Sequence, residues 1–477
     1  MRKFDAIIIG SGPNGLAAAI TFQQQGLSTL LVEGADTIGG GMRTKELTLQ
    51  GFQHDVCSAI HPMAMASPFF RSLPLETFGL SFVKPKYAAA HPLLGGETGI
   101  LYHSLTETVQ ALGPDGDVYR RLVENVIEHW DELAPDIMGP LCLPKHPLLL
   151  ARFGLNALRP ASWTARRFST AAAKALWAGM AAHGIQPLTN WTTSAIAIVL
   201  SAVGNKYGWQ IPVGGSQSIA NALLQYYQSL GGEVQTDFWV EDIRDLPAYK
   251  VLLCDMTPKQ LLQLKGVDFT NSYRRRLARY RQGMGVFKVD WALSEMTPFK
   301  DLRCQEAATV HLGNTYAEIV ESERLGHLGR QVDRPFVLFS QQSAFDRSRA
   351  PEGKHTGWAY CHVPNGSTID YTEIIENQIE RFAPGFKDTI LAKHSFSPAQ
   401  LERYNPNYIG GDINGGVMDI TQLYSRPILA LNPYRTALEN MYICSSSTPP
   451  GGGVHGMCGY HAARMALNEH FGVVVKR

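Results

Sequence analysis

The chain has 477 residues, 45% of them apolar and 18% charged, which is enough to bury a large core in more than one domain. Its 43 basic and 42 acidic residues give a net charge of +1, which excludes a general electrostatic attraction to nucleic acid. Seven cysteines without a C-x-x-C spacing argue against zinc and favour a reducing, cytoplasmic location. Neither a signal peptide nor an apolar run of membrane-spanning length is predicted. We therefore expect a cytoplasmic protein without a bound metal.

The first predicted elements are a strand, a glycine turn, a helix and a second strand. Residues 4–9 form a short β-branched run that is typical of a buried strand. The next six residues match G-x-G-x-x-G, and residues 16–25 favour a helix. Residues 27–32 favour a strand that ends on Glu33. This order is typical of the βαβ unit that binds a dinucleotide.

Each part of this unit has a physical role in that interpretation. Gly10 permits a sharp turn, Gly12 lets the backbone approach a pyrophosphate, and Gly15 lets the helix pack closely on the strand. The unpaired N–H groups at the helix N-terminus face the phosphates. Glu33 accepts hydrogen bonds from ribose hydroxyls and repels a 2′-phosphate, which disfavours an NADP-type ligand. The predicted nucleotide-binding residues here are Gly10, Gly12, Pro13, Asn14, Gly15 and Glu33.

The middle of the chain is predicted to be mostly helical between residues 104 and 200, with helices at 118–133, 169–182 and 195–203. Within it, residues 141–168 combine leucines and Trp163 with several arginines. This mixture is typical of a segment that lies on a membrane surface and admits an apolar substrate. A helix at a domain interface is the other interpretation, and the sequence alone favours it over the membrane surface.

The second half of the chain shows a mixed α/β pattern. Helices are predicted at 218–230 and 369–382, and strands at 233–236, 238–240, 249–253, 286–292 and 336–341. A strand at 441–444, a glycine loop at 451–456 and a helix at 459–469 follow. The loop repeats G-x-G-x-x-G, but too little chain follows it to complete a second dinucleotide domain.

Three separated segments, 7–44, 211–240 and 440–463, together resemble the phytoene desaturase-related FAD oxidoreductases. Their glycine pattern includes G-G-x-x-R-[ST], which matches residues 39–44, and segments 307–313, 349–353 and 410–413 also look similar. The family often has His-Pro before its C-terminal glycines, whereas this chain has Pro449-Pro450.

The resemblance implies FAD as the cofactor and assigns further residues to it. Gly40 and Gly41 pass close to the flavin side of the pyrophosphate, and Arg43 helps to hold the cofactor. Val240 meets the adenine through its backbone. The C-terminal loop faces the flavin ring through Gly453, Val454 and Gly456, and the following helix N-terminus stabilises negative charge on the reduced ring.

The implied fold class is α/β, with a Rossmann-type FAD-binding domain of the glutathione reductase and amine oxidase kind and a discontinuous, mixed α+β substrate domain. The FAD-binding domain is expected to comprise residues 1–85, 205–265 and 430–477. The substrate domain is expected to comprise a helical part, 86–204, and a sheet-containing part, 266–429.

The expected function is removal of a hydride from an apolar substrate, such as a polyene or isoprenoid, with oxygen or a quinone as acceptor. A flavin amine oxidase and a non-catalytic flavin-binding protein are the alternatives. Asp412 lies in a glycine-flanked loop, and His311 and His455 can exchange protons near neutral pH. These three are the candidate catalytic residues, although each also fits a structural role.

Overall fold

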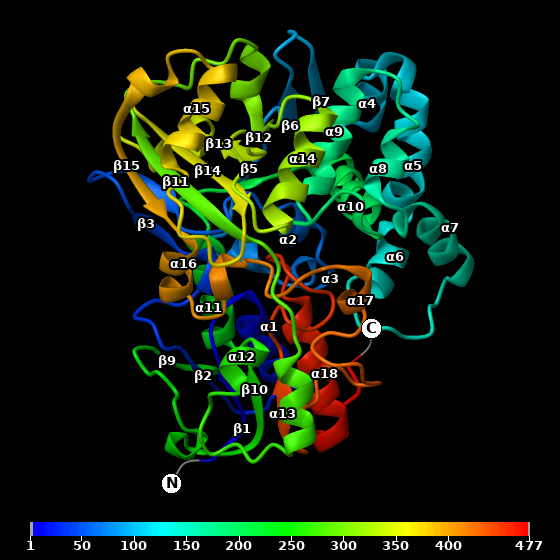
Figure 1. Ribbon diagram of the computed structural model, residues 1–477. Coiled ribbons are helices and arrows are strands. Elements are labelled where there is room, and N and C mark those ends of the chain that lie inside the picture. Colours follow the sequence, from blue (N-terminus) through cyan, green and yellow to red (C-terminus); the bar gives the residue numbers. More distant parts are fainter. Residues whose placement is uncertain (1–2, 476–477) are drawn as a thin grey trace.

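The computed structural model describes residues 3–475 and contains two sheets, one above the other, with a group of helices beside the upper sheet (Figure 1). The lower sheet contains both the first and the last strand of the described chain. None of the described helices is both long enough and apolar enough to cross a bilayer.

The lower sheet has five strands, and every neighbouring pair in it is parallel. In spatial order its strands are β16 (Met441–Ile443), β10 (Ala248–Cys254), β1 (Lys3–Ile9), β2 (Thr29–Val32) and β9 (Glu233–Gln235). The central strand β1 is almost fully buried, as its β-branched run predicts. All five strands fall within the three segments expected for the nucleotide-binding domain.

Helix α1 (Pro13–Gln23) packs between the lower sheet, α11 (Gln217–Ser229) and α18 (Met457–Phe471). Its residues from Asn14 to Gln23 are all buried, so it is covered on every side. Two glycines allow this packing. A Cβ on Gly15 would overlap the carbonyl oxygen of Gly10, and a Cβ on Gly459 in α18 would overlap that of Asn14.

The upper sheet has seven strands, antiparallel except for one parallel pair, β12 and β6. In spatial order they are β15 (Ile390–Phe396), β11 (Gly285–Leu293), β14 (His355–Val363), β13 (Val337–Ser340), β12 (Ala307–Leu312), β6 (Tyr87–Pro92) and β7 (Thr98–Tyr102). One face packs against α15 (Thr372–Phe382) to form a separate apolar core. The opposite face carries Trp358, Tyr360 and His311.

The helices beside the upper sheet come from one continuous part of the chain. They are α4 (Leu105–Ala111), α5 (Gly116–Glu128), α6 (Trp130–Ile137), α7 (Pro147–Ala157), α8 (Ala161–Ala165), α9 (Ala171–Ala182) and α10 (Thr193–Lys206). Helices α9 and α10 pack against each other, and α9 also contacts β6 and β7. The remaining helix on this face of the sheet is α14 (Tyr316–His327).

Shorter elements complete the chain. They are α2 (Pro62–Ala66), α3 (Pro68–Arg71), α12 (Pro258–Leu261), α13 (Asn271–Ala278), α16 (Pro398–Tyr404), α17 (Ile420–Leu423), β3 (Thr44–Glu46), β4 (Gln53–Asp55), β5 (Phe82–Val83) and β8 (Ile211–Pro212).

Three local predictions were wrong. The expected strand at 238–240 is a loop, because the chain reverses at Asp237, whose φ is 55°, and leaves Trp239 exposed. The expected helix at 118–133 is two helices, α5 and α6, which meet at His129. The segment 86–204, expected to be helical, begins with strands β6 and β7, which extend the upper sheet.

We predict that Gly459→Ala lowers the free energy of unfolding by at least about 1–3 kcal/mol, the usual cost of inserting a methyl group into a packed interior. The new Cβ would force α18 away from the backbone of Asn14. Thermal unfolding of the purified protein measures the change. Gly95→Ala is the control, because no heavy atom lies within 4 Å of its Cβ position. Equal melting temperatures for the two variants would contradict the prediction.

Candidate functional site

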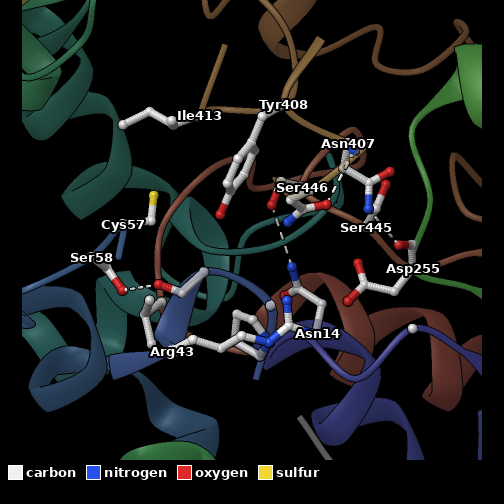
Figure 2. A pocket seen from close by; sticks show the side chains of 18 of the residues that line it. Asn14, Arg43, Cys57, Ser58, Asp255, Asn407, Tyr408, Ile413, Ser445 and Ser446 are labelled. Atoms are coloured by element: carbon white, nitrogen blue, oxygen red, sulfur yellow. Dashed lines mark hydrogen bonds between the residues drawn. The ribbon is translucent and has the colours of Figure 1, made fainter. Parts of the chain in front are cut away.

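A cavity of about 520 Å³ lies between the two sheets and takes its walls from both. Figure 2 shows Asn14 and Arg43 on one side of it and Tyr408 and Ile413 on the other. The lower wall contains the glycine turn, Glu33, Arg43, Val240 and Asp255. The upper wall contains His183, Leu200, Trp209, Thr309, Leu338, Trp358 and Tyr360. The cavity therefore extends from the predicted nucleotide site to the upper sheet.

The glycine turn presents bare backbone to the cavity at the start of α1. Gly12 caps this helix, and Pro13 occupies its first turn, where no N–H is needed. The Asn14 side chain donates a long hydrogen bond, 3.5 Å, to the Ser446 hydroxyl, and its Oδ1 is buried without a partner. The turn therefore combines a helix N-terminus with an unsatisfied buried acceptor, as expected where a polar ligand binds.

Glu33 is held in place by the protein itself. One carboxylate oxygen accepts hydrogen bonds from the N–H and hydroxyl of Ser11, at 2.9 and 2.5 Å. The other accepts from the Ala35 N–H at 3.0 Å and from the Arg43 guanidinium at 3.2 Å. A ribose hydroxyl that binds here would exchange with the Ser11 hydroxyl, the partner that a simple rotation can move away.

Arg43 is 4% exposed and is fixed between Glu33, the Thr37 carbonyl and an aromatic ring. Its guanidinium carbon lies 5.6 Å from the ring centroid of Tyr404, in a cation–π arrangement. The nearby glycines are tightly packed as well. A Cβ on Gly40 would lie 3.0 Å from the Cα of Gly12, and one on Gly41 would overlap the Tyr408 hydroxyl.

Asp255 follows β10 directly and lies at the N-terminus of α1. Its Oδ2 accepts the Gly15 N–H at 3.0 Å and would be 2.8 Å from a Cβ on Gly12. Burial raises the pKa of Asp255 to about 7, against the opposing Gly15 hydrogen bond, and Glu33 adds a smaller repulsive contribution. The group that faces the predicted pyrophosphate position therefore changes charge near neutral pH.

The C-terminal loop reaches the cavity through Gly453 and Val454. Gly456, with φ of 68°, caps α18 rather than lining the cavity. His455 is 2% exposed, and its Nδ1 accepts the Met457 N–H at 3.0 Å. Burial lowers the pKa of His455 to about 4, so this ring is neutral. Its role is to accept a hydrogen bond from the first N–H of α18.

Two histidines connect the upper wall to the interior. The Nε2 atoms of His183 and His311 lie 3.0 Å apart, so one ring donates to the other. The Nδ1 of His311 is buried without a partner. Because an unpaired buried N–H is rarely tolerated, we assign the His311 proton to Nε2. His183 then accepts at Nε2 and carries its own proton on Nδ1. Burial lowers its pKa to about 3, which keeps the ring neutral.

Asp412 organises a loop. Its carboxylate accepts the N–H groups of Gly283, Asn414 and Gly416 at 2.7–2.9 Å, and the residue is 1% exposed. Its neighbours Ile413 and Asn414 line the cavity, whereas Asp412 does not, within the described residues. The catalytic roles expected for Asp412, His311 and His455 stay predictions, since none of these three described residues lines the cavity; His311 reaches its wall through His183, and Asp412 through the Asn414 N–H.

Sequence reasoning did not identify Asp255, His183 or the tyrosines of the 404–408 loop. Asp255 could have been found, because it directly follows a predicted strand, and the carboxyl ends of parallel strands meet at the ligand edge of such a sheet. His183 follows an alanine-rich helix without any motif, and Tyr408 reaches the glycine cluster only through tertiary packing.

Known proteins are similar to this chain in sequence and in fold. A family model described as an NAD(P)-binding Rossmann-like domain matches residues 8–73. Pyridine nucleotide-disulfide oxidoreductase domain-containing protein 2 of Mus musculus is 23% identical, with 98% of this chain and 94% of that protein aligned. Phytoene desaturase (lycopene-forming) of Pseudescherichia vulneris is 23% identical over 98% of this chain and 99% of that protein.

The fold is also similar to that of cyclohexylamine oxidase from Brevibacterium oxydans, with a TM-score of 0.60 at 13% identity and 98% of each chain covered. The fold and the nucleotide turn thus define the class of proteins with a Rossmann-like domain in a mixed α/β architecture, which confirms the predicted fold class. Within that class, the chain is related to the phytoene desaturases along almost its whole length, which confirms the predicted relationship.

We predict that Asp255→Asn makes the ligand-free protein progressively more stable than the wild type as pH rises from about 4 to 8. The folded-state pKa, about 7, lies above the ordinary value of 3.8, so ionisation favours the unfolded chain. The free energy of unfolding of the wild type therefore falls as pH rises, until pH has passed the folded-state pKa of about 7. Asparagine keeps an acceptor for the Gly15 N–H and cannot ionise.

Melting temperatures of the two proteins across this pH range test the prediction. Each unit of pKa displacement corresponds to about 1.4 kcal/mol, so the difference is measurable. Asp36→Asn, at an exposed carboxylate, is the control and should not alter the profile. Parallel profiles for wild type and Asp255→Asn would show that Asp255 does not titrate near neutrality.

Proposed function

We propose that the protein is an FAD-dependent oxidoreductase that removes a hydride from an apolar substrate bound in the cavity. A single observation carries the proposal: one cavity joins a dinucleotide-type glycine turn to a wall of apolar and aromatic side chains. When bound, FAD supplies the two-electron acceptor, and the protein supplies orientation, exclusion of water and charge.

The lower wall fits this cofactor. The start of α1 meets the pyrophosphate at Gly12 and Asn14, while Glu33 accepts a ribose hydroxyl in exchange for that of Ser11. Val240 lies at the same end of the cavity wall as Glu33 for contact with adenine. Gly40, Gly41 and Arg43 follow beside Gly12 and Glu33, and with Gly453 and Val454 they would surround the flavin part of the cofactor.

An apolar substrate suits the upper wall. Five of its seven lining residues are apolar or aromatic, namely Leu200, Trp209, Leu338, Trp358 and Tyr360. No carboxylate from the described upper sheet or the helices beside it lines the cavity, and His183 is held neutral by burial. A charged substrate would lose hydration there without gaining an ionic partner. The His183 Nδ1–H is a single oriented donor that can position a substrate next to the cofactor.

An amine oxidase is the second candidate, favoured by one observation. Trp358 and Tyr360 alternate along β14 toward the cavity, with ring centroids 5.2 Å apart and planes at 81°. Such an aromatic pair can hold an amine. One observation weakens this alternative: the Lys288 ammonium, which pairs with Asp290, already lies 5.9 Å from the Trp358 ring centroid.

We predict that the purified protein contains one FAD per chain and that Glu33→Gln lowers FAD affinity at least about tenfold. The change removes the negative charge that accepts ribose and Arg43 donors, a loss of about 1.5–3 kcal/mol for a hydrogen bond to a charged group. Extraction and mass measurement identify the ligand, and titration with FAD gives the affinity.

Asp36→Asn serves as the control, since this exposed carboxylate lies three residues along the chain and outside the cavity wall. Recovery of NAD in place of FAD, or of no nucleotide from folded protein, would refute the cofactor assignment. Unchanged affinity in Glu33→Gln would show that Glu33 does not bind ribose.

We predict that polyenes or long acyl chains bleach the bound flavin in the absence of oxygen, and that primary amines do not. In the proposed reaction a substrate carbon would lose a hydride to FAD, the neighbouring carbon would lose a proton to solvent, and a double bond would form between the two carbons. Absorbance near the flavin maximum follows the reaction, and readmission of oxygen or addition of a quinone tests reoxidation.

Leu200→Glu adds a carboxylate to the upper wall and should abolish bleaching by apolar compounds, while dithionite still reduces the flavin. Bleaching by amines alone would favour the amine oxidase. A flavin that only dithionite reduces, whichever compound is added, would favour a non-catalytic flavin-binding protein.

A further inference from the structure

The helices beside the upper sheet belong to a part of the chain with an unusual charge distribution. Residues 137–232 contain seven lysines and arginines and not a single aspartate or glutamate, although the whole chain has 42 acidic residues. Five of the cations, Lys145, Arg152, Arg159, Arg166 and Arg167, fall between the end of α6 and the start of α9, and all five are exposed. This surface is therefore locally basic in a protein of almost zero net charge.

These cations are not neutralised by the protein. Within residues 3–475, none of the five forms an ion pair. Arg167 donates instead to the neutral amide of Asn156, at 3.2 Å. Burial and then the nearby Arg159 and Arg121 lower the pKa of Arg167, which is the effect expected of neighbouring like charges.

The same surface exposes large apolar side chains, which we call the α7 patch. Leu143 is 93% exposed and Leu148 87%, and only Ala157 of α7 is buried. The other members are Leu141, Leu155, Leu158, Trp163 and Trp191, which are 43–68% exposed. Trp163 and Trp191 lie together, with ring centroids 5.3 Å apart. In Figure 1, α7 stands at the outer edge of the molecule, on the side away from β15.

The spacing along α7 places its leucines and arginines in one row. Leu148, Arg152 and Leu155 are four and three residues apart, so they share one face of the helix, and Arg159 follows four residues later. The half-buried Leu149, Leu150 and Phe153 pack against the core on the other face. Long arginine side chains beside exposed leucines can keep their charge in water while the leucines enter an apolar phase.

We propose that the α7 patch docks the protein on an anionic lipid bilayer. Leu143 and Leu148, which are 93% and 87% exposed, would insert among the lipid acyl chains. The two tryptophans suit the interfacial level of a bilayer, and the unpaired cations would meet lipid phosphates. A protein partner would need carboxylates to satisfy the arginines and a shaped apolar surface to cover the leucines. An anionic bilayer supplies both negative groups for the arginines and an apolar phase for the leucines, and it needs no specific shape.

The position of the patch is also consistent with substrate entry, a point that rests on the proposed function. Trp191 lies just before α10, and Leu200, seven residues into this helix, lines the cavity. At 1.5 Å per residue, the cavity wall begins about 10 Å along the helix axis from the end that carries the patch. An apolar compound dissolved in the bilayer would thus be held close to the upper wall.

Vesicle flotation of the full-length, cofactor-loaded protein tests the proposal. We expect binding to phosphatidylcholine vesicles that contain 30% phosphatidylserine, binding at least tenfold weaker to phosphatidylcholine alone, and loss of binding in high salt. Leu143→Asp with Leu148→Asp should reduce binding at least tenfold. Arg152→Gln with Arg159→Gln should remove the preference for anionic lipid.

Two control variants lie outside the patch. Leu302→Asp changes a leucine that is 67% exposed, and Arg330→Gln changes an exposed arginine, and both should bind like the wild type. Wild-type binding by the leucine variant, or equal affinity for neutral and anionic vesicles, would overturn the proposal. Lipid-free dimerisation that the leucine variant abolishes would show that the patch is a protein interface instead. Flavin content, measured on the same samples, reports separately on the proposed function.

Discussion

The close approach of three backbone segments around the start of α1 is the constraint on which the rest of the structure depends. Gly15 lets the helix lie against the turn that precedes it, and Gly459 lets α18 touch the carbonyl of Asn14 from the other side. With no side chain at these points, β1, α1 and α18 form one packed unit. The C-terminal loop that precedes α18 is thereby held beside the glycine turn, and both line the same cavity.

The cavity is divided by polarity, and the division follows from the two sheets. Charged side chains from the parallel sheet and its loops meet at one end, where Glu33 and Arg43 neutralise each other and Asp255 takes a helix N-terminal N–H. The antiparallel sheet supplies alternate residues of its strands to the other end, and these are mostly apolar. A cofactor with a charged diphosphate and a flat, less polar ring matches this gradient.

Local patterns predicted much of this architecture, because the forces that form each element act over a few residues. The buried run before Gly10, the glycine turn and Glu33 all lie where the sequence predicts. Contacts between distant segments could not be predicted in this way. Nothing near His183 indicates its bond to His311, 128 residues away. At Asp237 a single residue with positive φ bends the chain, so the expected strand after it does not form.

The assembly of the parallel sheet from three distant segments has a consequence for synthesis of the protein. Helix α1 is buried on every side and is covered in part by α18, which the ribosome makes more than 400 residues later. At about 5–20 residues per second, roughly 20–90 s separate the two helices. During that interval the N-terminal βαβ unit exposes surface that only the finished chain buries. Apolar surface that stays exposed for this long during synthesis is prone to aggregation, so the order in which the segments are made works against the order in which they pack.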